Sequence, residues 1–111
     1  MVSIDFVKDN RTVIVKINEE IDHHACEKIR SKIDLAIEFR KAKNLVFDFD
    51  GVNFMDSSGI GLIMGRFKLI KSLGGDLKVI NVPKNLDRMI RLSGLSQLGI
   101  FESEDKASCK N

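Results

Sequence analysis

Short runs of β-branched and apolar residues alternate with longer segments of helical periodicity along this chain. Each run has the length of a strand, and each longer segment places apolar residues three or four positions apart, on one face of a helix. The predicted strands are 3–7, 12–17, 45–49, 77–80 and 98–101, and the predicted helices are 22–40, 59–73 and 83–92. The order β-β-α-β-α-β-α-β predicts an α/β fold with a mixed, mostly parallel sheet packed with about three to four helices.

The length of 111 residues, of which 43% are hydrophobic and 31% charged, suits one compact domain. We therefore expect a single domain over residues 1–111, with a frayed polar tail at 102–111. The net charge of +2 does not favour a nucleic-acid partner. No basic leader with an apolar stretch opens the chain and no run of about 18 apolar residues follows, so we expect a cytoplasmic protein without a membrane partner. Cys26 and Cys109 lack the spacing of a metal or redox motif and are expected to be free thiols.

The run 45–49 is almost entirely apolar, which predicts a strand buried on both faces. The letters DFDG at its end resemble the nucleophile loop of haloacid-dehalogenase-type phosphatases, in which the first aspartate attacks phosphorus beside Mg²⁺. The acidic residues after Asp50 do not form the paired motif that would complete such a metal site. We therefore expect Asp48 and Asp50 to close the strand and shape the turn at Gly51, and we keep a small Mg²⁺-dependent phosphatase using Asp48 as an alternative.

The segment Asp-Ser-Ser-Gly at 56–59 stands directly before a helical pattern. A helix start leaves its first N–H groups unpaired and carries about half a positive charge. The structural interpretation is that Ser57 or Ser58 is the N-cap of this helix.

Two further features favour a binding role for the same segment. Gly59, Gly61 and Gly65 remove side chains from the first turns, so that another surface can approach the backbone closely. A phosphate on a serine here would be tolerated by the helix start, and it would add nearly two negative charges beside Asp56. Such a phosphate would repel an apolar or acidic partner, which makes the segment a candidate switch.

A catalytic role for these serines is not favoured. A nucleophilic serine needs a base, and the only histidines are His23 and His24. Neighbouring residues on a helix point about 100° apart, so the two histidines do not converge as metal ligands. We expect no catalytic residue, no metal and no cofactor, and hence a protein that is not an enzyme.

Four segments together resemble the anti-sigma factor antagonist family, and in particular its sporulation-type members, which are stand-alone STAS domains. They are 54–61 (FMDSSGIG), 64–68 (MGRFK), 20–24 (EIDHH) and 93–95 (SGL). The similarity spans nearly the whole chain in order. One departure is Glu19, which stands where the family often has glycine and puts the conformation of that loop in question.

The resemblance implies a mechanism. The unmodified protein binds an anti-sigma factor that is itself a serine kinase, with ATP or ADP bound on the kinase, and the sigma factor is freed. The kinase then phosphorylates the serine that follows the aspartate, the complex dissociates, and a serine phosphatase resets the switch. By position the acceptor is Ser57, and the residues alone leave Ser58 open as the alternative.

The resemblance also implies a partner-binding surface in which Glu20 and Asp22 face basic residues of the kinase. Its members are Glu20, Asp22, Asp56, Ser57, Ser58, Gly59, Ile60 and Gly61. The Asp-His-His segment favours the sporulation pathway, and a stress-response sigma pathway is the alternative.

Overall fold

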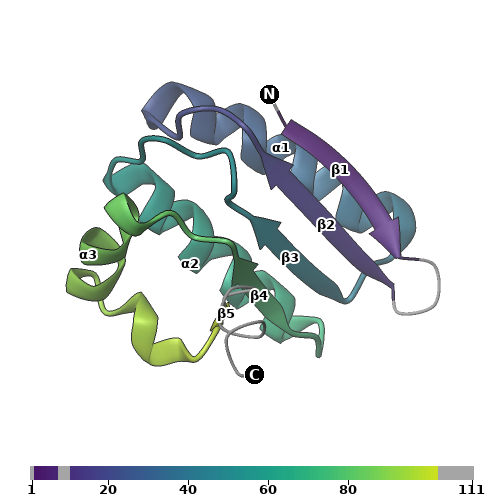
Figure 1. The fold of residues 1–111 in the computed structure, drawn as a ribbon. Helices are drawn as coiled ribbons and strands as arrows, with labels where there is room; N and C mark the ends of the chain where they lie inside the picture. The colour runs from purple at the N-terminus through teal and green to yellow at the C-terminus, as the bar shows by residue number, and fades with distance from the viewer. Residues whose placement is uncertain (1, 8–10, 103–111) are drawn as a thin grey trace, which may run out of the picture.

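The computed structural model of the chain describes residues 2–7 and 11–102, which form a five-stranded sheet in the order β1-β2-β3-β4-β5 (Figure 1). The strands are β1 (Val2–Val7), β2 (Thr12–Ile17), β3 (Asn44–Asp48), β4 (Leu77–Ile80) and β5 (Phe101–Glu102). β1 is antiparallel to β2, and the other three pairings are parallel. The predicted mixed, mostly parallel sheet is therefore confirmed.

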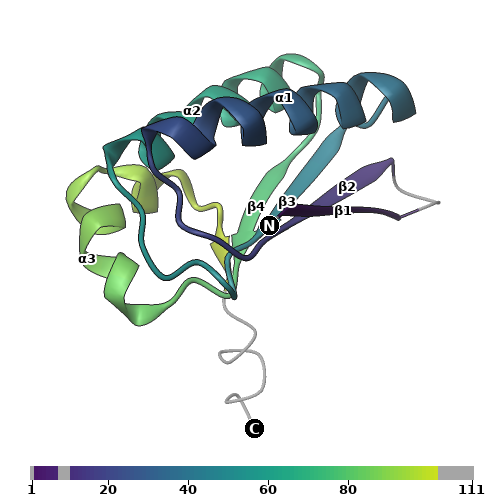
Figure 2. The ribbon, with the colours of Figure 1, turned by 90° about the horizontal axis from the view of Figure 1, so that it is seen from above.

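Three α-helices and one 3₁₀ helix connect the strands: α1 (His23–Arg40), α2 (Ser57–Ser72), α3 (Lys84–Leu92) and η1 (Leu95–Leu98). α1 and α2 lie side by side over the same face of the sheet, and α3 lies near the start of α2, at one end of the molecule (Figure 2). None of the described helices is long and apolar enough to cross a membrane.

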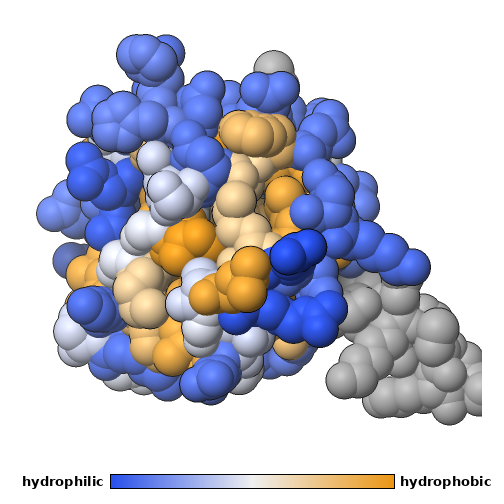
Figure 3. All heavy atoms as spheres, turned by 90° about the vertical axis from the view of Figure 1, so that its left-hand side faces the viewer, coloured by the Kyte–Doolittle hydropathy of each residue, from blue (hydrophilic) through white to orange (hydrophobic). Residues whose placement is uncertain are grey.

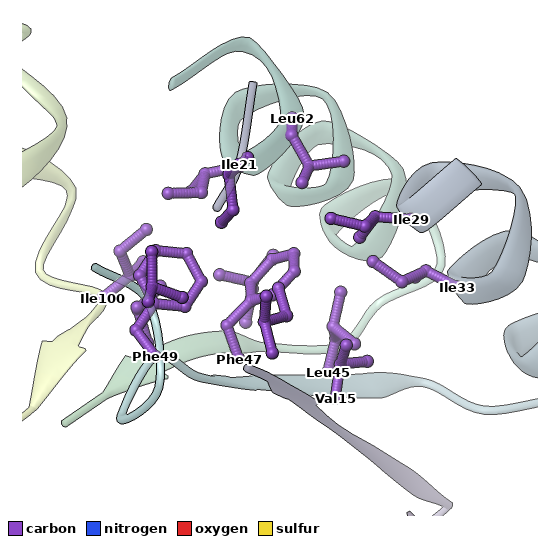
Figure 4. Packing of buried hydrophobic residues seen from close by; sticks show 14 of the residues in the cluster. Val15, Ile21, Ile29, Ile33, Leu45, Phe47, Phe49, Leu62 and Ile100 are labelled. Carbon is purple, nitrogen blue, oxygen red and sulfur yellow. The ribbon is translucent and has the colours of Figure 1, made fainter. Parts of the chain in front are cut away.

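The core lies between the sheet and the two helices that cover it. Ile29 and Ile33 of α1 point toward Leu45 of β3, and Phe47 lies beneath Leu62 of α2 (Figure 4). Each of these side chains is at most 6% exposed. This single layer of apolar side chains holds the helices at fixed positions on the sheet.

The prediction that β3 is buried on both faces is wrong. Leu45 and Phe47 are fully buried, whereas Val46 and Asp48 between them are only half-buried. The reason is that α1 and α2 cover one face of the sheet, so β3 alternates between buried and partly open positions.

The end of the chain also differs from the prediction of a strand at 98–101. Residues Leu95–Leu98 form η1 instead, and the last strand is β5. Gly94 and Gly99 flank η1 with positive φ angles of 85° and 71°, which glycine adopts without steric cost and which interrupt an extended chain. Glu102, predicted to begin the tail, belongs to β5, and residues 103–111 lie outside the described part. Cys109 also lies outside it.

The topology gathers the starts of all three α-helices at one end of the sheet. α1, α2 and α3 follow β2, β3 and β4, which run parallel, so their carboxyl ends share one edge (Figure 1). In open α/β sheets this edge is where binding sites form.

Candidate functional site

The loops that precede α1 and α2 are joined by an isolated parallel β-bridge between Ile21 and Met55. The Ile21 N–H donates to the Phe54 carbonyl at 2.9 Å, and the Asp56 N–H donates to the Ile21 carbonyl at 3.1 Å. The two predicted partner-binding segments, 20–22 and 56–61, are therefore brought together.

Both helices that start beside this bridge are capped by an aspartate. The Asp22 carboxylate accepts the N–H of Ala25 at 2.8 Å and caps the start of α1. The Asp56 carboxylate accepts the N–H of Ser58 at 2.8 Å. The prediction that Ser57 or Ser58 caps α2 is therefore wrong, because Asp56 has the extended backbone of an N-cap and its longer side chain reaches the free amide.

The two serines face different hollows. Ser57 is exposed and lines a hollow of about 610 Å³ between α2 and α3. Ser58 is half-buried and lines a groove of about 310 Å³ between α1 and α2. The geometry therefore separates two residues that the sequence left equivalent.

The first hollow, which we call the α2/α3 hollow, has an apolar floor and polar ends. Its lining residues are Ser57, Ile60, Asn85, Arg88, Met89, Leu92 and Ser93. Figure 3 shows this end of the molecule, where hydrophobic atoms gather at the centre and hydrophilic ones surround them. Leu92 is 77% exposed and adds apolar surface to this hollow. The Asn85 amide donates to the Asn53 carbonyl at 2.9 Å and fastens α3 to the loop before α2.

The sequence reasoning did not include α3 in the site. The signal was present in the element order, because α3 follows the strand next to β3 and its start must share the edge of the sheet with the start of α2.

The second hollow, which we call the α1/α2 groove, has basic walls and acidic caps nearby. Its lining residues are His23, Cys26, Glu27, Arg30, Ser58, Gly61, Leu62, Gly65 and Arg66. Partial burial raises the pKa of the Cys26 thiol above its ordinary value, and the negative charges of Asp56 and Asp22 raise it further, against Arg30, which lowers it. Both capping carboxylates therefore act on Cys26 of α1.

The glycines of α2 divide into two kinds. Gly59 is buried, and a Cβ there would overlap the Met55 side chain and lie 3.3 Å from Ile21 Cγ2. Gly61 and Gly65 have open space where a Cβ would stand. The predicted access to the backbone thus exists at Gly61 and Gly65, whereas Gly59 packs α2 against the bridge.

Asp48, the first aspartate of the segment that resembled a phosphatase loop, makes structural contacts, as predicted. Asp48 Oδ1 accepts the Asp50 N–H at 3.1 Å and the Asn81 side-chain amide at 3.1 Å. Asp48 thereby closes β3 and ties its end to the end of β4. His23 and His24, in the first turn of α1, are exposed.

The predicted partner-binding residues share this end of the molecule but differ in exposure. Glu20, Ser57 and Gly61 are exposed, and Gly59 is buried. Asp22, Asp56, Ser58 and Ile60 are half-buried. Three of the members that are not buried, Glu20, Asp22 and Asp56, are acidic.

Comparison with known proteins places the chain among regulators of transcription. The family model "STAS domain" matches residues 3–107. The chain is 38% identical over 96 residues to an anti-sigma F factor antagonist of Paenibacillus polymyxa, covering 86% of this chain and 82% of that one. It is 30% identical over 97 residues to an anti-sigma-B factor antagonist of Bacillus subtilis, covering 87% of each.

The solved structures of the anti-sigma factor antagonist SpoIIAA from Bacillus have the same fold. The unphosphorylated form matches with a TM-score of 0.81 at 28% identity, over 99% of this chain and 95% of that one. The phosphorylated form matches with a TM-score of 0.74, over 99% and 98%. The family resemblance read from the four sequence segments is confirmed, and the chain belongs to the STAS domain family.

Proposed function

We propose that this chain is an anti-sigma factor antagonist switched by phosphorylation of Ser57. In its unmodified form it binds an anti-sigma factor that is a serine kinase, and the sigma factor is released. The observation that carries the proposal is the position of Ser57, which is the exposed first residue of α2 beside the acidic cap and on the rim of the α2/α3 hollow. The names of the relatives and the existence of a phosphorylated SpoIIAA support it.

Ser57 suits the acceptor role better than Ser58. Its exposed hydroxyl is open to a second protein, whereas Ser58 is half-buried in the α1/α2 groove and its N–H is held by Asp56. In the transfer, a bond forms between Ser57 Oγ and the γ-phosphorus of ATP on the kinase, and the bond from that phosphorus to the bridging oxygen breaks. ADP stays with the kinase, and the hydroxyl proton leaves to a base of the kinase or to solvent. This chain supplies the acceptor, so we propose that it is not an enzyme.

The partner surface combines charge and apolar area. Glu20, Asp22 and Asp56 form an acidic rim that suits basic residues on the kinase, and Ile60 with Leu92 offers apolar contact. A phosphate on Ser57 carries about −1.5 to −2 charges, which adds repulsion and a desolvation cost where the partner must dock. A serine phosphatase that removes it would restore the binding form, and ATP, kinase and sigma factor place the cycle in the cytoplasm.

We propose a sporulation pathway, because the chain is 38% identical to the anti-sigma F factor antagonist and 30% identical to the anti-sigma-B factor antagonist. A stress-response sigma pathway is the second candidate. Titration of the chain against purified anti-sigma F and anti-sigma-B factors separates the two, and stronger binding to the anti-sigma-B factor would reverse the assignment.

The test of the acceptor is incubation with the cognate kinase and ATP, followed by intact-mass and peptide mass spectrometry. We expect the chain to gain one phosphate, the Ser57→Ala variant to gain none, and the matched Ser58→Ala variant to gain one. Phosphorylation of Ser57→Ala would move the acceptor to another residue. If the kinase phosphorylates a control substrate completely and this chain stays unmodified, the phosphorylation switch is rejected.

A further inference from the structure

We propose that Arg88 of α3 binds the phosphoryl group on Ser57 and thereby closes the α2/α3 hollow in the phosphorylated form. The inference rests on the proposed function, because it takes Ser57 to be the phosphorylated residue. It adds a second action of the phosphate, which is a contact within this chain that covers part of the partner surface.

Ser57 and Arg88 line the same hollow. Ser57 and Ile60 of α2 form one wall of the α2/α3 hollow, and Arg88, Met89 and Leu92 of α3 form the opposite wall. Because Ser57 and Arg88 line the same hollow, a phosphoryl group on Ser57 would stand at the border of a space that Arg88 also borders.

The Arg88 guanidinium differs from those of two other arginines, which pair with carboxylates. Arg66 pairs with Asp34 at 3.0 Å, and Arg91 pairs with Asp87 on its own helix. Arg88 is exposed and has no hydrogen bond or ion pair to another residue within 2–7 and 11–102. A free guanidinium presents a planar fork of donors that matches phosphate oxygens and binds them in pairs.

The charged side chains around Ser57 favour a phosphate that turns toward α3. Asp22 caps the start of α1 and Asp56 the start of α2, and the negative charges of both act on Cys26 of α1. A phosphate of nearly two negative charges is therefore repelled from the α1 side and drawn toward α3. On α3 the single acidic residue, Asp87, is already paired with Arg91, which leaves the Arg88 charge available.

A contact between this phosphate and Arg88 has a consequence for the apolar floor. It draws the two walls of the hollow together over Ile60 and Met89, which then cannot take up a side chain of the partner. Phosphorylation would thus remove apolar contact area as well as add charge.

The test uses the full chain with phosphoserine inserted at position 57 during translation, so that no kinase is needed. The phosphate pKa is measured by ³¹P NMR, because an arginine contact stabilises the dianion and lowers its second pKa from about 6. We expect Arg88→Gln to raise this pKa by about 0.5, as for a partly exposed ion pair. The matched variant Arg30→Gln removes the same charge on the other side of α2 and should leave the pKa unchanged.

A second readout is the ¹⁵N side-chain spectrum, in which the Arg88 Nε–H signal should move on phosphorylation and the Arg30 signal should not. Equal phosphate pKa values with and without Arg88, together with an unmoved Arg88 signal, overturn the proposal and leave the acceptor role of Ser57 intact. Failure of the kinase to modify Ser57 rejects the proposed function instead, and it does not affect this titration. Because Arg88 is exposed, its replacement should leave the fold intact. A thermal unfolding curve that matches that of the unsubstituted chain checks this.

Discussion

Ile21 and Met55 pair as an isolated parallel β-bridge, and this pairing places the caps of two helices side by side. Asp22 follows the first bridge residue and Asp56 follows the second, so two carboxylates that are far apart in the sequence flank one surface. The bridge is buried, since Ile21 and Met55 are at most 1% exposed. We infer that the rigidity of the site depends on how tightly α2 packs against this bridge.

The first prediction concerns that packing. Gly59→Ala should lower the free energy of unfolding by about 1–2 kcal/mol, because the added methyl overlaps the buried Met55 side chain. The helix preference for alanine over glycine offsets part of this cost. Urea unfolding monitored by circular dichroism measures the change.

Gly61→Ala is the matched control for this prediction. A Cβ at Gly61 meets open space, so the same substitution two residues later should raise stability by up to about 1 kcal/mol. Equal stability changes for the two variants would contradict a packing role that is specific to Gly59.

The second prediction concerns the cap of α2. Asp56→Ala should cost about 1 kcal/mol of stability, because the Ser58 N–H loses its acceptor. Asp56→Asn should stay close to the unsubstituted chain, since asparagine caps equally well without the charge. If thermal unfolding shows that both variants lose the same stability, the charge of Asp56 matters more than its hydrogen bond.

The third prediction concerns pH. Burial and the charges of Asp56 and Asp22 raise the pKa of the Cys26 thiol, so its alkylation by iodoacetamide should reach half its maximal rate at a higher pH in the folded chain than in urea. Cys109→Ser makes Cys26 the only thiol for this measurement. Asp56→Asn should lower the pKa, because it removes one of the negative charges.

The raised pKa of Cys26 also makes the stability of the chain depend on pH. The folded state holds the thiol proton more tightly than the unfolded state, so the contribution is present below the unfolded pKa and is lost as the pH rises through the folded pKa. A Cys26→Ala variant should therefore lose less stability than the chain with Cys26 over this alkaline range. Parallel losses for the two chains would contradict the raised pKa.

Much of the fold could be predicted because periodicity reports which side of each element is buried. β2 and β4 have the predicted bounds. Periodicity failed for β3, since an apolar run does not tell whether helices cover one face of a sheet or both. It failed again at residues 98–101, where the flanking glycines favour η1.

The site was predictable in part. The segments 20–22 and 56–61 were identified by family resemblance, but their meeting depends on a bridge between distant residues that no local pattern shows. The difference between Ser57 and Ser58 arises from the direction in which α2 begins, which Asp56 sets. Arg88 was missed because an arginine on a helix has no local signal of what lies across a hollow.

We propose that a phosphate on Ser57 switches off binding to the anti-sigma factor. The most direct test of this proposal is a calorimetric titration of the anti-sigma factor with the unmodified chain and with the chain that carries phosphoserine at position 57. We expect binding for the unmodified chain and an affinity at least about tenfold weaker for the phosphorylated one, a loss of about 1.4 kcal/mol or more. Equal affinities of the two forms would contradict it.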